Sequence, residues 1–373
     1  MKRNGGFTVR LLICAGGTGG GVSPALAVLE ALRGADESLE VLWIGGEGGM
    51  EARLVERAGV PFRAIPAAGL HGVGARRLPR NLWLLGRGYL AARRILRTFR
   101  PDVLFFTGGY LAAPVALAGQ RWPILLYVPD IEPALALRFL ARFADRIAVT
   151  TDESRVYFSA RKNVVVTGYP VRSALGGWNR AQGRAALQLQ EETPVLLVTG
   201  GSRGARSINQ AVLANLPALL EIAQVVHISG ELDWPLVEAR AREVHSPRYR
   251  AFPYLHEEMG AALAAADLVL SRAGASTLGE YPRFGLPAIL VPYPYAWRYQ
   301  KVNAEYLVRR GAAVMVEDSA LAGHLLPTVR ALLENPARLQ AMRAAMEHLY
   351  QPQAATEIAR QLLALAEGSR ANG

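Results

Sequence analysis

The chain has 373 residues, of which 51% are hydrophobic and 20% are charged, so it is long enough for two domains with large cores and too apolar to be an intrinsically disordered protein. Lysine and arginine number 42 against 31 acidic residues, and this net charge of +11 predicts an anionic partner: nucleic acid, an anionic membrane surface or a phosphorylated substrate. The single cysteine, Cys14, excludes a disulfide scaffold and a zinc site built from cysteines.

We expect neither a signal peptide nor a membrane-spanning helix. Lys2 and Arg3 precede an apolar run at residues 7–15, but Arg10 interrupts the run and glycines follow it, which is typical of a first β-strand. The most apolar region, residues 103–118, is interrupted by glycine and proline and falls short of the roughly 20 apolar residues of a membrane span. We therefore expect a cytosolic protein, either soluble or attached to a membrane surface.

In the first half of the chain, short β-branched or leucine-rich runs alternate with helical patterns. We expect strands at residues 9–15, 41–44, 103–106, 124–128 and 147–150. The first three strands lead into glycines and then into helical patterns at residues 24–33, 50–58 and 111–118. Strands that alternate with helices predict a parallel sheet of the doubly wound type.

The same pattern restarts after a cluster of glycine and proline at residues 168–177. We expect strands at residues 195–199, 225–229, 268–271 and 288–292, with helices at 180–190 and 207–220. The predicted fold class is therefore α/β, with two Rossmann-like doubly wound domains at residues 1–170 and 171–348. A helical tail at residues 349–373 is expected to pack back on the first domain. Such halves bind ligands at the carboxyl ends of their strands, in the cleft between them.

A glycine-rich loop follows the first strand of each half. Residues 16–21 (Gly-Gly-Thr-Gly-Gly-Gly) lie between a strand and a helix, where backbone amides and the helix dipole can hold a phosphate. The loop lacks the lysine of a P-loop, Val22 replaces the third glycine of a dinucleotide fingerprint, and residues 43–46 offer no acid after the second strand. A tight turn without a ligand is the alternative, but the similar loop at residues 200–204 favours ligand binding.

Residues 271–280 (Ser-Arg-Ala-Gly-Ala-Ser-Thr-Leu-Gly-Glu) form a third candidate site after the strand at 268–271. Small residues and hydroxyls at a helix start suit a diphosphate, and Glu280, about one turn further on, can reach a diol such as a ribose. An ordinary capped helix with a solvated Glu280 is the alternative. There is no D-x-D motif, so the charge of a leaving diphosphate is expected to be met by amides, hydroxyls and arginine rather than by a metal ion.

The region from Arg76 to Arg100 contains eight arginines and no acid, interleaved with tryptophan, tyrosine and leucine. This composition is typical of a helix that lies in an anionic membrane interface, where each basic residue contributes on the order of 1 kcal/mol. An ordinary helix with its apolar side in the core is the alternative, and nucleic acid is disfavoured because no binding motif is present. The membrane contacts are assigned to Arg76, Arg77, Arg80, Trp83 and Arg87.

Taken in order, these motifs resemble the MurG family of GT-B glycosyltransferases over essentially the whole chain. The matching segments are residues 16–20, 107–110, 168–172, 200–205, 271–280, 285–288 and 291–292, followed by Arg298, Gln300 and Asn303. The resemblance implies a GT-B fold, in which two Rossmann-like domains face each other across a cleft. It also implies an inverting transfer of GlcNAc, without metal or cofactor, from UDP-GlcNAc to the 4-hydroxyl of MurNAc in lipid I. The product would be lipid II for peptidoglycan synthesis, made at the cytoplasmic face of the cell membrane on an undecaprenyl pyrophosphate acceptor.

The resemblance also implies roles for individual residues. Ser202 and the amides of residues 275–278 hold the diphosphate, and Arg172 lies near the nucleotide. Glu280 binds the ribose, the backbone at His256 contacts the uracil and Gln300 contacts the sugar. The donor set is Thr18, Gly19, Gly20, Asp130, Arg172, Ser202, His256, Ala275, Ser276, Thr277, Leu278, Gly279, Glu280 and Gln300. The acceptor pyrophosphate is assigned to the loops of Gly16, Gly17, Thr18, Gly19, Gly20, Gly108, Gly109 and Tyr110.

The chain departs from the family pattern on the acceptor side. The family has a histidine where this chain has Gly21, and His-Glu-Gln-Asn where it has Tyr-Val-Pro-Asp at residues 127–130. Asp130 is the candidate catalytic base, and a helix cap or turn residue is its alternative. His71, in a glycine-flanked loop, can also reach the cleft. Two other functions stay open: a related transferase with another lipid-linked acceptor, and a non-catalytic protein that binds a nucleotide sugar.

Overall fold

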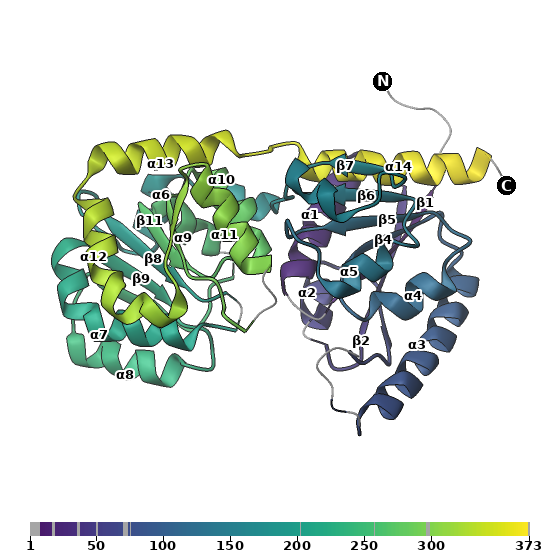
Figure 1. Cartoon of the computed structure of the whole chain (residues 1–373), viewed down its shortest axis with the longest axis horizontal. Coiled ribbons are helices and arrows are strands. Elements are labelled where there is room, and N and C mark those ends of the chain that lie inside the picture. Colours follow the sequence, from purple (N-terminus) through teal and green to yellow (C-terminus); the bar gives the residue numbers. More distant parts are fainter. Residues whose placement is uncertain are drawn as a thin grey trace. The chain divides into compact units, whose positions relative to one another are not determined.

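A computed structural model of the chain describes residues 8–16, 19–35, 38–49, 51–69, 74, 76–201, 203–256, 258–295 and 299–371. The chain forms two compact units, residues 1–172 with 352–373 and residues 173–351 (Figure 1). We predicted domain boundaries after residues 170 and 348, and the units change at residues 172 and 351. Each unit contains a parallel sheet covered by helices.

The first unit has a sheet of seven parallel strands in the order β3-β2-β1-β4-β5-β6-β7. Their bounds are β1 (Val9–Ala15), β2 (Leu39–Gly46), β3 (Phe62–Ile65), β4 (Val103–Gly108), β5 (Ile124–Val128), β6 (Arg146–Val149) and β7 (Val164–Val166). The order reverses between β1 and β4, which pair directly, so the loops after these two strands meet at one edge of the sheet.

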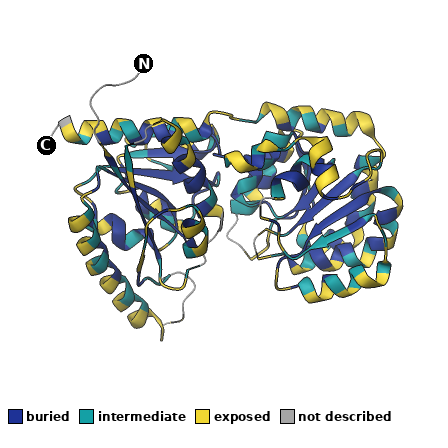
Figure 2. Ribbon diagram, turned by 180° about the vertical axis from the view of Figure 1, so that it is seen from behind, coloured by how far each residue is buried: buried dark blue, intermediate teal, exposed yellow. Residues whose placement is uncertain are grey.

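Helices cover both faces of this sheet. They are α1 (Gly19–Ala35), α2 (Glu51–Arg57), α3 (Leu78–Phe99), α4 (Ala112–Ala118), α5 (Leu135–Leu140), the 3-10 helix η1 (Asp152–Tyr157) and α14 (Ala354–Ala371). Leu11 and Ile13 of β1 belong to one hydrophobic core, whereas Leu12 and Cys14 belong to another. Because successive strand residues point to opposite faces, these alternating memberships show that both faces are buried (Figure 2).

The carboxyl-terminal helix α14 belongs to the first unit, although the second unit precedes it in the chain. It packs along α1, and Ile358 and Leu362 enter the core that α1 shares with β1 (Figure 1). Arg370 then forms an ion pair with Asp102 at the start of β4, at 2.5 Å. Apolar packing and an ion pair therefore hold the end of the chain on this unit.

The second unit repeats the topology with six parallel strands in the order β10-β9-β8-β11-β12-β13, which reverses between β8 and β11. The strands are β8 (Val195–Thr199), β9 (Gln224–Ile228), β10 (Tyr249–Phe252), β11 (Leu268–Ser271), β12 (Ala288–Leu290) and β13 (Ala313–Met315). The α-helices are α6 (Arg180–Ala186), α7 (Arg206–Ile222), α8 (Trp234–Val244), α9 (Met259–Ala265), α10 (Glu280–Phe284), α11 (Tyr299–Arg309), α12 (Leu321–Leu333) and α13 (Pro336–His348). The 3-10 helices are η2 (Ser173–Gly177), η3 (Ala275–Leu278) and η4 (Asp318–Ala320). The prediction of an α/β chain with two doubly wound parallel sheets is confirmed.

Candidate functional site

At the carboxyl edge of the first sheet, the loop after β1 touches the loop after β4. A Cβ atom on Gly109 would lie 2.8 Å from the carbonyl oxygen of Gly16, and Gly109 has a φ of +90°. Gly108, the last residue of β4, has a φ of +127°, so both glycines need their residue type for their backbone conformation. The structure therefore brings together Gly16, Gly108 and Gly109, three of the residues that we assigned to the acceptor pyrophosphate.

Helix α1 begins beside this contact. Its first residue is Gly19, Gly20 is exposed, and the Thr107 hydroxyl donates a hydrogen bond of 2.6 Å to the carbonyl oxygen of Gly21. A Cβ atom on Gly21 would lie 3.5 Å from the Thr107 hydroxyl, an ordinary contact, so this position has room for a side chain. The amino end of a 17-residue helix thus lies at the edge, where its dipole favours an anion. Gly17, Thr18 and His71 lie outside the described residues.

A buried carboxylate that we did not predict lies beneath the same loops. Glu51, the first residue of α2, is 1% exposed and accepts a hydrogen bond of 2.8 Å from the Gly46 amide. Cβ atoms on Gly16 and Gly49 would come within 2.5 Å and 2.3 Å of its carboxylate oxygen. Burial, and secondarily the Glu51 charge, raise the pKa of the Cys14 thiol well above its ordinary range, so this thiol is not an activated nucleophile.

Asp130 lies just past the end of β5, at the same edge of the sheet, and is partly exposed. Helix α5 begins only at Leu135 with Ala134 as its cap, so Asp130 is not a helix cap; it lies in a bend, and the alternative of a turn residue stays open. Tyr127 is fully buried in β5, and its hydroxyl lies 2.9 Å from the Thr150 hydroxyl. The Tyr127 pKa is raised well above its usual value, chiefly by burial and also by the Asp130 charge, against the hydrogen bond with Thr150. Of residues 127–130, Asp130 is the one that is partly exposed, whereas the other three are buried.

Tyr110 and Arg172 complete the residues that we predicted in this unit. Tyr110 follows Gly109 and is 46% exposed, so an aromatic ring borders the acceptor loops. Arg172 is partly buried at the end of the unit, and its Nε makes no hydrogen bond with the described residues. Most of the other residues predicted to bind the donor belong to the second unit. The donor role of Arg172 therefore stays a prediction.

At the carboxyl edge of the second sheet, the loop after β8 packs closely against the end of β9. A Cβ atom on Gly204 would lie 2.2 Å from the carbonyl oxygen of Ser229, and Gly204 has a φ of +76°. Helix α7 begins two residues later, at Arg206, and runs for 17 residues. Its amino end therefore lies at this edge, next to the loop after β11. Ser202 lies outside the described residues.

Arg272 connects the loops of this edge. Its guanidinium group donates to Asp318 at 2.5 Å, to the Ser207 hydroxyl at 2.8 Å and to the Val291 carbonyl oxygen at 3.1 Å. The Ser207 hydroxyl also donates to Asp318 at 2.6 Å. One arginine thus joins the segments after β11 and β12 to the starts of α7 and η4. The motif indicated that this segment binds a ligand, but the sequence alone did not indicate this network.

The segment at residues 271–280 forms a 3-10 turn and not the helix start that we expected. Residues 275–278 form η3, and α10 begins at Glu280. The buried Thr277 hydroxyl donates to the Gly274 carbonyl oxygen at 2.8 Å, so it stabilises the turn. Ser276 and Glu280 are partly exposed, whereas Ala275, Thr277, Leu278 and Gly279 are buried. Ser276 is therefore the hydroxyl of this turn that is placed to meet a ligand.

Gln300 and His256 lie on other segments of the second unit. Gln300 is the second residue of α11, and its side-chain oxygen accepts a hydrogen bond of 2.9 Å from the Tyr293 amide. The guanidinium carbon of Arg272 lies 5.2 Å from the centre of the Tyr293 ring, so Gln300 is linked to the Arg272 network. His256 is exposed after β10, with its ring centroid 4.7 Å from that of Tyr254. No cluster of His, Cys, Asp or Glu that could hold a metal ion occurs in the described ranges.

Helix α3 presents an apolar and basic surface. Ala92 and Leu96 near its carboxyl end are buried, whereas Leu82, Trp83 and Leu90 are 52%, 60% and 64% exposed. One face of α3, with Gly88, Ala92 and Leu96, therefore packs in the core as the alternative of an ordinary helix requires, while other apolar side chains of the helix are exposed (Figure 2). The exposed arginines at its amino-terminal end are Arg76, Arg77, Arg80 and Arg87. Among the helices of the described segments, none is long and apolar enough to cross a membrane.

Comparisons with known proteins agree on one family. Residues 11–149 match the glycosyltransferase family 28 N-terminal domain, and residues 195–362 match the family 28 C-terminal domain. The chain is 40% identical to the UDP-N-acetylglucosamine–N-acetylmuramyl-(pentapeptide) pyrophosphoryl-undecaprenol N-acetylglucosamine transferase of Roseiflexus sp., with 94% of each chain covered. It is 41% identical to the transferase of the same name from Desulforudis audaxviator, with 94% of this chain and 96% of the relative covered.

Solved structures show the same fold. The crystal structure of Acinetobacter baumannii MurG superposes with a TM-score of 0.74 at 27% identity, covering 95% of this chain and 99% of that one. The UDP-GlcNAc 2-epimerase from Neisseria meningitidis, bound to UDP-GlcNAc, has a TM-score of 0.67 at 16% identity, covering 95% and 100%. At that identity the likeness to the epimerase shows the fold alone.

Proposed function

The chain belongs to the MurG transferases of glycosyltransferase family 28, and on that premise we propose that it transfers GlcNAc from UDP-GlcNAc to the 4-hydroxyl of MurNAc in lipid I, giving lipid II. The observation that supports this most strongly is the identity of about 40% to transferases of that name over 94% of the chain. The placement of predicted donor and acceptor residues on the carboxyl edges of two doubly wound sheets also supports it.

We propose that the donor binds at the edge formed by the loops after β8 and β11. The Ser276 hydroxyl, the amides of the η3 turn and the amino end of α7 stabilise the diphosphate. Glu280 accepts hydrogen bonds from the ribose hydroxyls, and Gln300 binds the hydroxyls of the sugar. The Arg272 network keeps these loops in place. Hydrogen-bond donors fixed in this way stabilise the negative charge that develops on UDP as it leaves.

We assign the acceptor to the carboxyl edge of the first sheet, where the glycine-containing loops after β1 and β4 meet. The amino end of α1 and the loop amides near Gly16 and Gly109 bind its pyrophosphate, and Tyr110 borders it. Asp130 takes the proton of the 4-hydroxyl while the hydroxyl oxygen attacks the anomeric carbon. The bond from the anomeric carbon to the UDP oxygen breaks with its electron pair leaving on UDP. Attack on the face opposite UDP inverts the anomeric configuration.

We also propose that α3 attaches the protein to the cytoplasmic surface of the membrane. Its exposed leucines and Trp83 enter the headgroup region while its arginines bind anionic lipids, an arrangement that suits a lipid-linked acceptor. Sedimentation with vesicles that contain phosphatidylglycerol tests this proposal. Replacing Arg77, Arg80 and Arg87 by glutamine should weaken sedimentation and leave turnover of a water-soluble acceptor unchanged.

Turnover of UDP-GlcNAc with a short-chain analogue of lipid I tests the proposed reaction directly. We expect lipid II analogue and UDP in equal amounts, without added metal. Binding of UDP-GlcNAc without turnover of any lipid-linked acceptor would overturn the proposal in favour of a non-catalytic protein. Turnover with another lipid-linked acceptor, but not with the lipid I analogue, would retain the fold and chemistry and replace the acceptor.

A further inference from the structure

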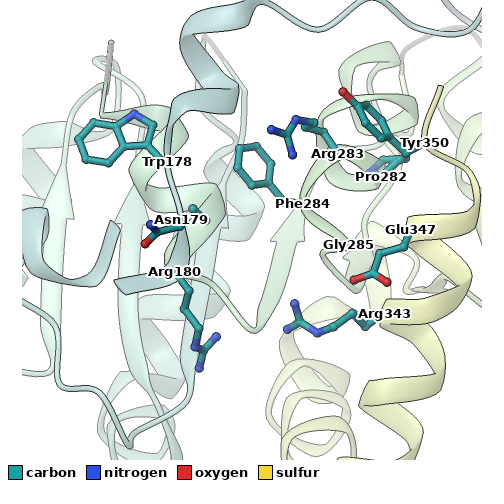
Figure 3. Close-up of a pocket in the computed structure, with 11 residues that line it drawn as sticks. Trp178, Asn179, Arg180, Pro282, Arg283, Phe284, Gly285, Arg343, Glu347 and Tyr350 are labelled. Carbon is teal, nitrogen blue, oxygen red and sulfur yellow. The ribbon is translucent and has the colours of Figure 1, made fainter. Parts of the chain in front are cut away.

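The second unit contains a cavity of about 410 Å³ that neither substrate assignment uses. It is lined by residues at the start of α6, in α10, and in and just after α13, among them Trp178, Arg180, Arg283, Phe284, Arg343 and Tyr350 (Figure 3). Arg180 and Arg343 both reach towards Asp267, the residue that precedes β11. The cavity therefore lies at the amino ends of the strands, the edge opposite to the loops after β8 and β11.

Positive charge exceeds negative charge around this cavity. The Asp267 carboxylate is approached by three guanidinium groups, from Arg180 at 2.5 Å, Arg184 at 2.9 Å and Arg343 at 3.8 Å. Arg184 is 3% exposed, and its pKa is lowered by burial and by the neighbouring Arg180 charge. One carboxylate thus offsets only part of the charge of three arginines.

Arg343 is the arginine of this group that is held least closely by Asp267. Asp267 already accepts close hydrogen bonds from Arg180, Arg184 and the Val195 amide, so its contact with Arg343 is the longest. The Arg343 side chain is 26% exposed and lines the cavity. Glu347, one turn further along α13, is the acidic side chain that lines it, and a Cβ atom on Gly285 would lie 2.5 Å from its Cγ.

Aromatic rings form much of the remaining wall. The Arg283 guanidinium lies 5.7 Å from the centre of the Phe284 ring and 5.6 Å from that of Tyr350, and it donates to the Gly176 carbonyl oxygen at 3.0 Å. Figure 3 shows Phe284 between Trp178 and Arg283, with Arg180 and Arg343 on another side of the space. Such walls bind planar rings by stacking and by cation–π contacts.

We propose that this cavity binds a phosphate ester that bears a planar ring. The phosphate binds Arg343 and the exposed side of Arg180, because guanidinium groups bind phosphate oxygens through paired, charge-assisted hydrogen bonds. The ring stacks against Tyr350 and Phe284. A cavity of about 410 Å³ lies within the range of small-molecule sites and is large enough for one ring with its phosphate.

The position of the cavity in the chain suggests what a bound ligand does. Trp178 and Arg180 follow closely on the first residue of the second unit, Ser173, whereas Arg343 and Tyr350 precede its last residue, Gln351. A ligand that contacts both segments joins the first and last parts of this unit. It should therefore raise the unfolding temperature of the full chain, and the rise should continue with ligand concentration after the site is saturated.

Isothermal titration calorimetry of the full chain with phenyl phosphate tests the proposal. We expect saturable binding at one site, weaker binding of inorganic phosphate and no binding of phenol. Arg343→Gln should weaken binding about tenfold, the loss of a charge-assisted contact to phosphate. Arg338→Gln, an exposed arginine of the same helix outside the cavity, is the matched control and should bind as the unsubstituted chain does.

Two further measurements separate the proposal from its competitors. Tyr350→Leu should reduce the affinity for phenyl phosphate and leave that for inorganic phosphate unchanged, which a purely electrostatic surface would not do. Ser276→Ala, at the opposite edge of the sheet, should leave the affinity for phenyl phosphate unchanged, because that edge is assigned to the donor. Equal affinity for phenyl phosphate in the Arg343→Gln and Arg338→Gln variants, or weaker binding in the Ser276→Ala variant, would overturn the proposal.

Discussion

The two units share one strand topology, yet they hold the loops of their carboxyl edges in different ways. In the first unit the loops touch backbone to backbone at Gly16 and Gly109, above the buried Glu51 carboxylate. In the second unit Arg272 joins the loops through Asp318, Ser207 and a carbonyl oxygen. The loops of the first edge are thus held by close backbone contacts, and those of the second edge by a hydrogen-bonded network. Substitutions should distinguish these two kinds of contact.

The largest effect is expected at Asp130, which gives the first edge its proposed chemistry. Asp130→Asn keeps the shape of the side chain but cannot take the acceptor proton, so kcat should fall by roughly 10²- to 10⁴-fold with little change in stability. Steady-state kinetics with the lipid I analogue measures this. Asp152→Asn, a carboxylate after β6 that is 82% exposed, should retain kcat within about twofold. Equal rates in both variants would remove Asp130 as the base.

Arg272→Met should break the network of the second edge. Removing one partner of a buried ion pair costs about 3–5 kcal/mol, and because the Arg272 and Asp318 side chains are 11% and 21% exposed we expect about 3 kcal/mol. The affinity for UDP-GlcNAc should fall together with the stability. Calorimetry measures the affinity, and urea unfolding measures the stability. Arg240→Met is the matched control, because its ion pair with Glu243 is exposed. Unchanged donor affinity in a folded Arg272→Met variant would show that the loops do not depend on this arginine.

Glu51→Gln tests the corresponding support of the first edge. The neutral amide replaces a carboxylate oxygen that accepts from Gly46, so we expect a loss of about 1–3 kcal/mol of stability. The KM for the lipid acceptor should rise more than the KM for UDP-GlcNAc, since Glu51 lies under the acceptor loops. Glu56→Gln, on the exposed face of the same helix, should change neither. An equal rise in both KM values would indicate a general structural role.

The central strands and the motif positions could be predicted from sequence because they depend on local patterns. Buried runs such as β1 and β8, each followed by glycines, identify both sheets and both edges. The edge strands of both sheets, β3, β7, β10 and β13, were missed, because they are short and partly exposed and take their hydrogen bonds from one neighbour. The contact of Glu51 with Gly16 and the hydrogen bonds of Arg272 involve residues far along the chain, which no local pattern encodes.

The smallest effect is expected at Gly21 and Gly109. Both lie at the glycine-rich edge of the first sheet, but only Gly109 has a backbone conformation that requires glycine. Gly21 is in α1 and has room for a Cβ atom, so Gly21→Ala should raise the unfolding free energy by about 0.5–1 kcal/mol. Gly109→Ala should lower it, because alanine is disfavoured at a φ of +90° and its Cβ would contact Gly16. Urea unfolding measures both. A loss of stability in the Gly21→Ala variant would mean that contact extends along the whole glycine run and not only between the loops after β1 and β4.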